Sequence, residues 1–238
     1  MYYGYGIDPT YILVLIGVVI TMFASAKLKN TFAKYSTVGS GSDLTGRDVA
    51  ERILQKNGIY DVQVLPVAGQ LTDHYDPSKK TVNLSEVIYN SRSVAALGVA
   101  AHECGHAIQD NTGYFPLRFR AAFVPVANFG SALSWPMIII GLILGQIGSG
   151  LGSNLISIGI FLFMLAVLFQ LITLPVEYDA SHRALVQLNE TGILLPDEEK
   201  EARSVLSAAA LTYVAAAASS LLQLLRLVIL FGGRRNSD

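Results

Sequence analysis

The chain has 238 residues, enough for one or two domains. Hydrophobic residues make up 52% of it, charged residues only 15%, and the mean hydropathy is +0.45. These values are high for a soluble protein and indicate a protein embedded in a lipid bilayer. The net charge of −1 argues against a nucleic-acid partner, and a single cysteine excludes an internal disulfide bond.

The first apolar segment spans residues 11–26. The nearest positive charges, Lys27 and Lys29, follow this segment, whereas a signal peptide carries its positive charge before the apolar stretch. We therefore expect residues 1–26 to form an N-terminal transmembrane anchor that is retained.

Residues 27–120 form the main polar region. Thr45, followed three residues later by Asp48, is typical of a capped helix N-terminus, so a short helix is expected there. Alternation of apolar and polar residues predicts short strands at 61–67 and 81–84.

Residues 121–176 contain no Asp, Glu, Lys or Arg. A patch rich in glycine and serine at residues 148–153 divides this run into two segments. Each segment is near the roughly 20 residues that a helix needs to span a bilayer. The run is therefore expected to form a transmembrane hairpin.

Two further helical segments complete the chain. Residues 177–203 are expected to form a helix, with Pro175 suited to its start. Residues 204–238 are expected to form an apolar helix followed by a basic tail. Arg226 interrupts the apolar helix, which either crosses the membrane or lies partly against the soluble part.

Lysine and arginine are distributed unevenly along the chain. Eleven lie in residues 27–120 and three in residues 177–203, but none precedes the first polar region and none lies in residues 146–153. Because short cytoplasmic segments carry an excess of positive charge, this pattern predicts a multi-pass protein of the cell membrane with both polar segments in the cytoplasm. Arg234 and Arg235 would be external if the last helix spans the membrane.

Residues 102–106 read H-E-x-x-H within a run of small and apolar residues. On a helix, His102 and His106 point about 40° apart, so both imidazoles can bind one Zn²⁺ ion. Glu103 lies beside the pair, where its carboxylate can reach a water molecule on the metal. This arrangement predicts metal-assisted hydrolysis of a peptide bond.

The helix that carries this motif should begin near residues 91–93. Cys104 points away from the histidines, and we interpret it as a packing residue. Gly98 and Gly105 share one edge of the metal-binding face, where the missing side chains would let another segment approach. Gln109 falls on the same face and is expected to line the site.

A motif of three fixed positions also occurs by chance, and its glutamate can simply face solvent. Here the apolar flanks place all three polar side chains on a partly buried helix, where a polar group without a partner is costly. A shared metal ion is the simplest partner for them.

Zinc needs a third protein ligand, and Glu177 is the candidate. It lies at the membrane boundary, on the side predicted to be cytoplasmic. Two histidines, one glutamate and a water molecule form the ligand set of thermolysin-type zinc enzymes.

Two parts of the sequence resemble a known family. Residues 71–77, 83–85 and 100–107 look like the first motif region of the YugP-type neutral zinc metallopeptidases of bacterial membranes, and residues 176–181 resemble the second motif of that family. The similarity covers nearly the whole chain.

This resemblance implies a gluzincin-like, zinc-dependent metalloendopeptidase that acts on a peptide or protein substrate. Its fold would be mainly α, with multi-pass membrane helices and a small α+β zincin-like domain on the cytoplasmic side. The metal ligands would be His102, His106 and Glu177, and Glu103 would be the general base.

The roles of other residues near Glu177 stay open. Membrane proteases of the CAAX-prenyl type carry an Asp four residues after the ligand glutamate, whereas this chain has Ser181 there. Asp179 either orients one of the two histidines or forms an ion pair with Arg183.

Candidates for stabilising an oxyanion are His182, Arg183, Tyr178, His74 and Tyr213, each of which could equally be a surface or packing residue. The strand at 81–84, which contains Asn83, either pairs with an extended substrate or is an ordinary strand of a small sheet.

The main alternative is a zinc-binding membrane scaffold or partner-binding protein without peptidase activity. Glu103 argues against it, because a structural zinc site does not need that acid. A transporter or channel is disfavoured by the absence of charged residues in 121–176, since ion pathways usually carry ionisable groups within the membrane. The sequence thus favours an integral-membrane zinc metallopeptidase that uses a metal-activated water.

Overall fold

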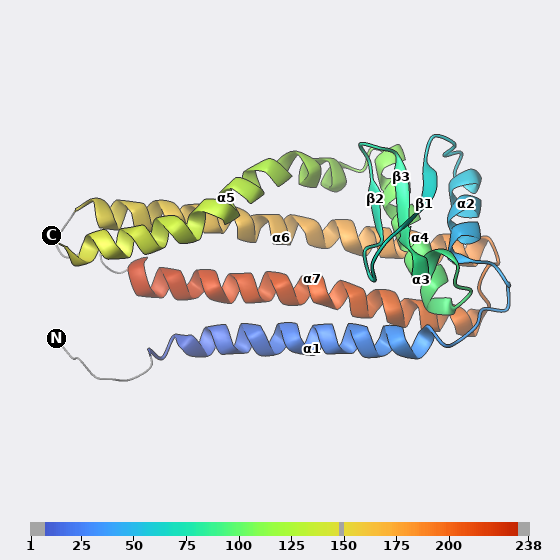
Figure 1. Ribbon diagram of the computed structural model, residues 1–238, viewed down its shortest axis with the longest axis horizontal. Helices are drawn as coiled ribbons and strands as arrows, with labels where there is room; N and C mark the ends of the chain where they lie inside the picture. The colour runs from blue at the N-terminus through green and yellow to red at the C-terminus, as the bar shows by residue number, and fades with distance from the viewer. Residues whose placement is uncertain (1–7, 148–149, 233–238) are drawn as a thin grey trace. The chain divides into compact units, whose positions relative to one another are not determined.

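The computed structural model describes residues 8–147 and 150–232 of the chain. Within them the protein is mainly helical, as predicted, and has a small sheet of three strands, two of which were predicted (Figure 1). The helices are α1 (Tyr11–Tyr35), α2 (Gly46–Lys56), α3 (Glu86–Tyr89), α4 (Val94–Asn111), α5 (Phe115–Gln146), α6 (Leu151–Glu190) and α7 (Pro196–Phe231). The strands are β1 (Gln63–Val67), β2 (His74–Asp76) and β3 (Thr81–Ser85). Arg234 and Arg235 lie outside the described residues.

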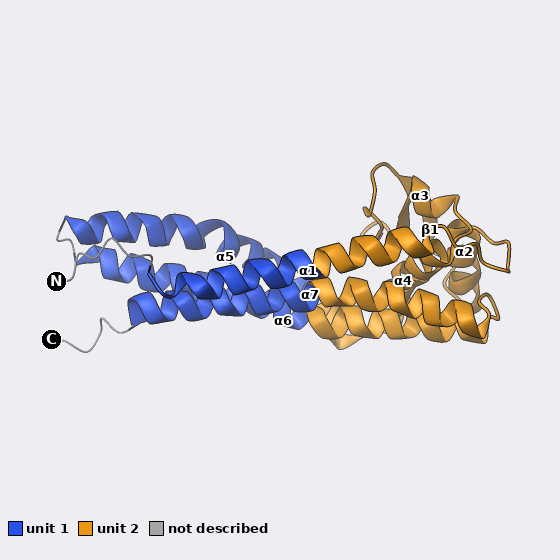
Figure 2. Cartoon of the chain, turned by 90° about the horizontal axis from the view of Figure 1, so that it is seen from below, with its two compact units in different colours: residues 1–23, 120–172, 213–238 blue, residues 24–119, 173–212 orange. Residues whose placement is uncertain are grey.

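The chain divides into two compact units, shown in different colours in Figure 2. Unit 1 comprises residues 1–23, 120–172 and 213–238, and unit 2 comprises residues 24–119 and 173–212. The two polar segments predicted from the sequence fall almost entirely in unit 2, which also holds the sheet.

Four helices in the described part of the chain are long and apolar enough to cross a membrane, namely α1, α5, α6 and α7. The predicted anchor corresponds to α1, and the predicted hairpin to α5 and α6. Helix α7 meets the same criteria despite Arg226. Within unit 1, α1 and α7 pack closely at small residues, since a Cβ atom added to Gly17 would lie 2.7 Å from the Ser219 hydroxyl.

Helix α6 differs from the prediction at Pro175. This proline lies inside α6, which continues without interruption to Glu190, so it does not begin a new helix. A proline removes one backbone hydrogen bond, and the turns on both sides keep the helix intact here. Glu177 is therefore carried by the same helix that forms the second half of the apolar hairpin.

Helix α2 begins with the predicted capping box. The Thr45 side chain accepts a hydrogen bond from the backbone N–H of Asp48, and the Asp48 carboxylate accepts one from the backbone N–H of Thr45. Its buried face, which includes Val49, Ala50 and Ile53, belongs to the apolar core of unit 2.

The sheet has the order β1-β3-β2, with β1 parallel and β2 antiparallel to β3. The strands predicted at 61–67 and 81–84 correspond to β1 and β3. The sequence analysis missed β2, which has only three residues. Its Tyr75 hydroxyl donates a hydrogen bond of 2.8 Å to the Asp110 carboxylate at the end of α4, and this contact ties the strand to that helix.

Of the two alternatives for residues 81–84, the structure favours the ordinary strand of a small sheet. Strand β3 is the central strand, so both of its edges are already occupied by β1 and β2. Asn83 pairs in register with Leu65 on one side and His74 on the other. Its side-chain amide donates to the Thr81 hydroxyl at 2.9 Å, so Asn83 serves the sheet itself.

Helix α4 lies in the core of unit 2. Ser93 caps it, with a side-chain oxygen that accepts a hydrogen bond of 3.2 Å from the backbone N–H of Ala96. The helix therefore begins within the predicted range. Alanine, valine and leucine side chains along α4 are buried in the core that also contains residues of α2, β3 and α6. A helix with so much of its surface covered can hold polar side chains only where they find partners.

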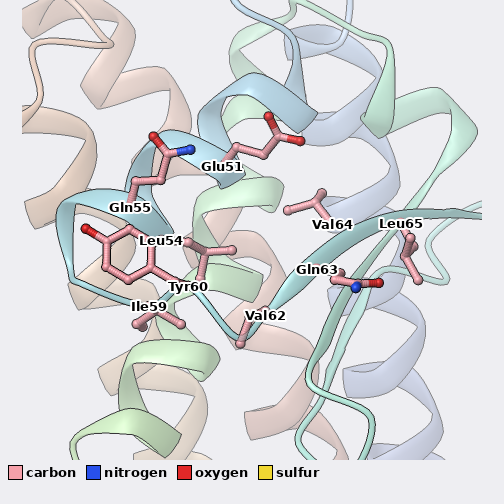
Figure 3. Close-up of a pocket in the computed structure, with 9 residues that line it drawn as sticks. All are labelled: Glu51, Leu54, Gln55, Ile59, Tyr60, Val62, Gln63, Val64 and Leu65. Atoms are coloured by element: carbon pink, nitrogen blue, oxygen red, sulfur yellow. The ribbon is translucent and has the colours of Figure 1, made fainter.

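A pocket of about 360 Å³ lies between α2 and β1 (Figure 3). Its lining includes Leu54 and Gln55 from α2, Tyr60 from the loop, and Val64 and Leu65 from β1. None of the predicted metal ligands lines this pocket.

Helix α4 meets α6 at Gly105 and α7 at Gly98. A Cβ atom added to Gly105 would overlap the backbone carbonyl of Ala180, whereas one added to Gly98 would meet the Ala202 side chain at an ordinary distance of 3.5 Å. The predicted close approach of another segment is confirmed at Gly105, whereas the contact of α7 with Gly98 has ordinary spacing.

We expect Gly105→Ala to lower the thermal unfolding midpoint of the detergent-solubilised protein. Overpacking costs about 1–3 kcal/mol, which outweighs the roughly 1 kcal/mol that alanine gains over glycine inside a helix. Gly98→Ala is the matched control and should unfold at or above the wild-type temperature. Equal midpoints for both variants would contradict this account of the contact.

Candidate metal centre

Three side chains of unit 2 converge on one point. His102 and His106 project from α4, and Glu177 projects from α6. The Glu177 Oε2 atom lies 3.3 Å from His102 Nε2 and 3.6 Å from His106 Nε2, and the two imidazole rings meet edge to face at 4.8 Å. All three potential ligand atoms lie within 4.8 Å of one another. The structure thus brings together the three residues that the sequence analysis named.

The Gln109 side chain determines which nitrogen of His106 carries the proton. Its Nε2 atom donates to the backbone carbonyl of Val176 and to the Asp179 carboxylate, each at 2.8 Å. Its Oε1 atom therefore faces His106 and accepts a hydrogen bond of 3.0 Å from Nδ1. In the neutral imidazole this leaves a lone pair on Nε2, the atom that points at Glu177.

The short distance between Nε2 of His106 and Oε2 of Glu177 is favourable only with a positive charge between the two atoms. The Nε2 lone pair of His106 and the carboxylate oxygen of Glu177 are both acceptors, so they repel each other unless a proton or a metal ion lies between them. Glu177 is 4% exposed and His106 is 7% exposed, so water can screen this repulsion only weakly.

The donor set fits zinc. Zinc accepts imidazole nitrogen and carboxylate oxygen ligands at about 2.0–2.2 Å, which places neighbouring ligands about 3.3–3.6 Å apart at the corners of a tetrahedron. The two distances from Glu177 to the histidines fall in this range. Three protein ligands also leave one corner for a water molecule, as in catalytic zinc sites.

Ser181 supports the second histidine. Its hydroxyl oxygen lies 3.1 Å from Nδ1 of His102 and can accept the proton of that nitrogen, which leaves Nε2 available as a ligand. Ser181 follows Glu177 by four residues, so the two side chains lie on the same face of α6. The sequence analysis noted this position but did not assign it a role.

Asp179 has both of the roles that the sequence left open, the ion pair with Arg183 and the orientation of a histidine. It forms the ion pair with Arg183, at 2.6 Å between Oδ2 and Nε. The same oxygen accepts the hydrogen bond from Gln109, which in turn binds His106. Asp179 therefore reaches the histidine through Gln109.

Glu103 lies beside the three converging side chains and is 7% exposed. Burial raises the pKa of its carboxyl group to about 7; the neighbouring His102 lowers it and Glu177 raises it further. The backbone N–H of Tyr75 on β2 lies close to the same carboxylate and lowers its pKa. Strand β2, which the sequence analysis missed, therefore borders this carboxylate.

The other candidate residues are arranged less favourably. His182 is exposed, and at about 100° per residue it lies far around α6 from Glu177. The Arg183 guanidinium is engaged by Asp179 and lies 5.6 Å over the Tyr114 ring. His74 hydrogen-bonds the backbone of Thr72 through Nδ1 at 2.8 Å.

Comparisons with known proteins agree with this chemistry. Residues 10–232 match the model of a family described as "Putative neutral zinc metallopeptidase". Among curated proteins, the chain is similar to the "Putative membrane protease YugP" of Bacillus subtilis (strain 168), with 46% identity over 219 residues that cover 92% of this chain and 95% of the relative. No solved structure matches the chain.

Cys104 should be unreactive in the folded protein. Its side chain is fully buried, its thiol faces the Ala50 carbonyl at 3.6 Å, and burial raises the pKa of the thiol. We expect a maleimide to leave the native protein unlabelled and to add one label per chain after denaturation, as measured by mass spectrometry. Rapid labelling of the native protein would contradict the interpretation of Cys104 as a packing residue.

Proposed function

The chain belongs to the neutral zinc metallopeptidase family, and on this premise we propose that it is an integral-membrane metallopeptidase that hydrolyses peptide bonds in peptide or protein substrates. The observation that carries the proposal is the convergence of His102, His106 and Glu177 from two different helices. The burial of His106 and Glu177 and the orientation of Gln109 support a metal ion as their common partner.

In this proposal, the two histidines and Glu177 hold Zn²⁺, and the site is gluzincin-like because the third ligand is a glutamate from a separate helix. A bound zinc ion supplies Lewis-acid activation of a water molecule and of the scissile carbonyl group. Gln109 and Ser181 hold the imidazoles in the tautomer and orientation that ligation requires.

Glu103 acts as the general base. It follows His102 directly on α4, so its carboxylate lies at the edge of the ligand cluster, where it can accept a proton from the attacking water and pass it to the leaving amine. The nearby backbone N–H of Tyr75 on β2 favours the ionised form of this carboxylate. No residue is assigned to the oxyanion, because Arg183 is held by Asp179 and His182 lies around the helix.

We further propose that the site lies on the cytoplasmic side of the membrane. The support is the charge distribution, since fourteen of the seventeen lysine and arginine residues fall in segments 27–120 and 177–203. The site residues come from these two segments.

Replacement of Glu103 should separate metal binding from catalysis. We expect Glu103→Gln to retain zinc, as measured by elemental analysis of the purified protein, and to cleave casein at least about a hundredfold more slowly than the wild type. His102→Ala and Glu177→Gln should lose both zinc and cleavage. Glu86→Gln, on an exposed position of α3, is the matched control and should keep both.

The outcomes distinguish the proposal from its alternative. Zinc in the wild type without cleavage of any peptide substrate would favour the zinc-binding scaffold. Absence of zinc from the wild type, under conditions where the protein is folded, would overturn the metal site itself.

Gln109 should contribute to metal affinity without being a ligand. We expect Gln109→Ala to weaken zinc binding about 10- to 100-fold, because His106 loses the hydrogen bond that fixes its tautomer. The measurement is competition with a zinc chelator of known affinity. Gln55→Ala, on the exposed side of α2, is the control, and equal zinc affinity in the two variants would contradict the role of Gln109.

A further inference from the structure

Besides the pocket between α2 and β1, a groove of about 510 Å³ lies between α1 and α7 within unit 2. Its α1 wall includes Lys27, Thr31 and Lys34, which recur at helical spacing on one face. Its α7 wall includes Arg203 and Ser207, also on one face. This groove shares no lining residue with the candidate metal centre.

The groove carries an excess of positive charge. Of its three cations, Arg203 is paired with Glu199 at 2.9 Å, and Lys34 lies 4.7 Å from the ring centre of Tyr35. Lys27 forms no ion pair within the described residues. Neither wall contributes an acidic side chain to the lining. The groove is therefore suited to an anion.

Hydrogen-bonding groups are also available in the groove. A serine or threonine inside a helix often donates back to the carbonyl one turn earlier, as Ser204 does to Lys200 at 2.8 Å. The hydroxyls of Thr31 and Ser207 and the side-chain amide of Asn30 donate no hydrogen bond of this kind within the described residues. All three groups line the groove. They can donate to the oxygens of a bound anion.

The sequence around the groove places it at the level of the lipid headgroups. Lys27 is the first charged residue after the uncharged run 9–26 of α1, and Arg203 is the last one before the uncharged run 204–225 of α7. Uncharged runs of this length cross the hydrocarbon core, so their charged ends lie in the interfacial layer. Basic pockets between membrane helices at this level bind anionic headgroups.

From the charge, the open hydrogen-bonding groups and this position, we propose that the groove between α1 and α7 binds the phosphate group of an anionic phospholipid. Lys27, Lys34 and Arg203 neutralise the phosphate, and Asn30, Thr31 and Ser207 donate hydrogen bonds to it. The acyl chains of such a lipid would lie along the apolar runs that begin at the groove.

The test uses the full-length protein, purified in a neutral detergent, and phosphatidylglycerol added in mixed micelles. Lipid binding is measured by native mass spectrometry, with phosphatidylcholine as the zwitterionic reference. The variant Lys27→Gln/Lys34→Gln/Arg203→Gln should bind phosphatidylglycerol about 100-fold more weakly, since each interfacial charge contributes about fivefold. The control Lys29→Gln/Lys79→Gln/Lys200→Gln removes three charges outside the groove and should bind like the wild type.

Three results would overturn the proposal. These are equal binding of the two lipids by the wild type, equal loss of binding in both triple variants, and equally tight binding of glycerol 3-phosphate, which would indicate a soluble phosphate ligand. The single variant Lys27→Gln guards against misfolding of the triple variant, and we expect it to weaken binding about fivefold. Unchanged binding would also contradict the proposal. Because lipid binding is measured without a protease substrate, failure here is distinguishable from failure of the proposed peptidase activity.

Discussion

The close approach of α6 to Gly105 of α4 is the constraint on which the candidate metal site depends. Ligand atoms on two helices can share one ion only if the packing of the helices holds those atoms within a few ångströms of one another. The missing side chain at Gly105 lets the Ala180 carbonyl reach α4. The same contact brings Glu177 and Ser181, on either side of Ala180, against the two histidines.

The polar groups of the site are stabilised as a connected set. Gln109 is fully buried, and both ends of its amide are used, because it accepts from His106 and donates to Val176 and Asp179. A buried side-chain amide whose oxygen and nitrogen both have hydrogen-bond partners is held in one orientation, whereas an amide that lacks one of these partners can adopt several. The chain thus fixes the proton on one nitrogen of His106 and leaves the other for a cation. Helix α4, whose other buried residues are mostly small or apolar, can hold the buried Gln109 because both ends of its amide have partners.

What could be predicted from the sequence was local. His102 and His106 could be placed because a four-residue spacing on a helix is enough to align them, and the four apolar helices follow from runs without charge. The contact of Ser181 with His102 depends on the register between two helices that are distant in sequence, which no local pattern contains. The prediction that Pro175 begins a helix was wrong because it considered only the turn that contains the proline. The helical turns on both sides of Pro175 keep α6 continuous. The choice between the two alternatives for the strand of Asn83 could not be made from the sequence, because the order of strands in a sheet is a property of the whole domain.

The continuity of α6 through Pro175 has a practical consequence for attempts to obtain the polar region as a soluble fragment. A polypeptide limited to residues 27–120 would contain both histidines and the whole sheet, yet it would lack the carboxylate, the hydroxyl and the backbone carbonyl that α6 provides. Glu177 cannot be added without α6, which is long and apolar enough to cross the bilayer, unless that helix is cut between its apolar run and its polar end. The candidate metal ligand Glu177 and a candidate membrane span are therefore parts of the same covalent segment. An excised, water-soluble version would need a new start for that helix, engineered close to Glu177.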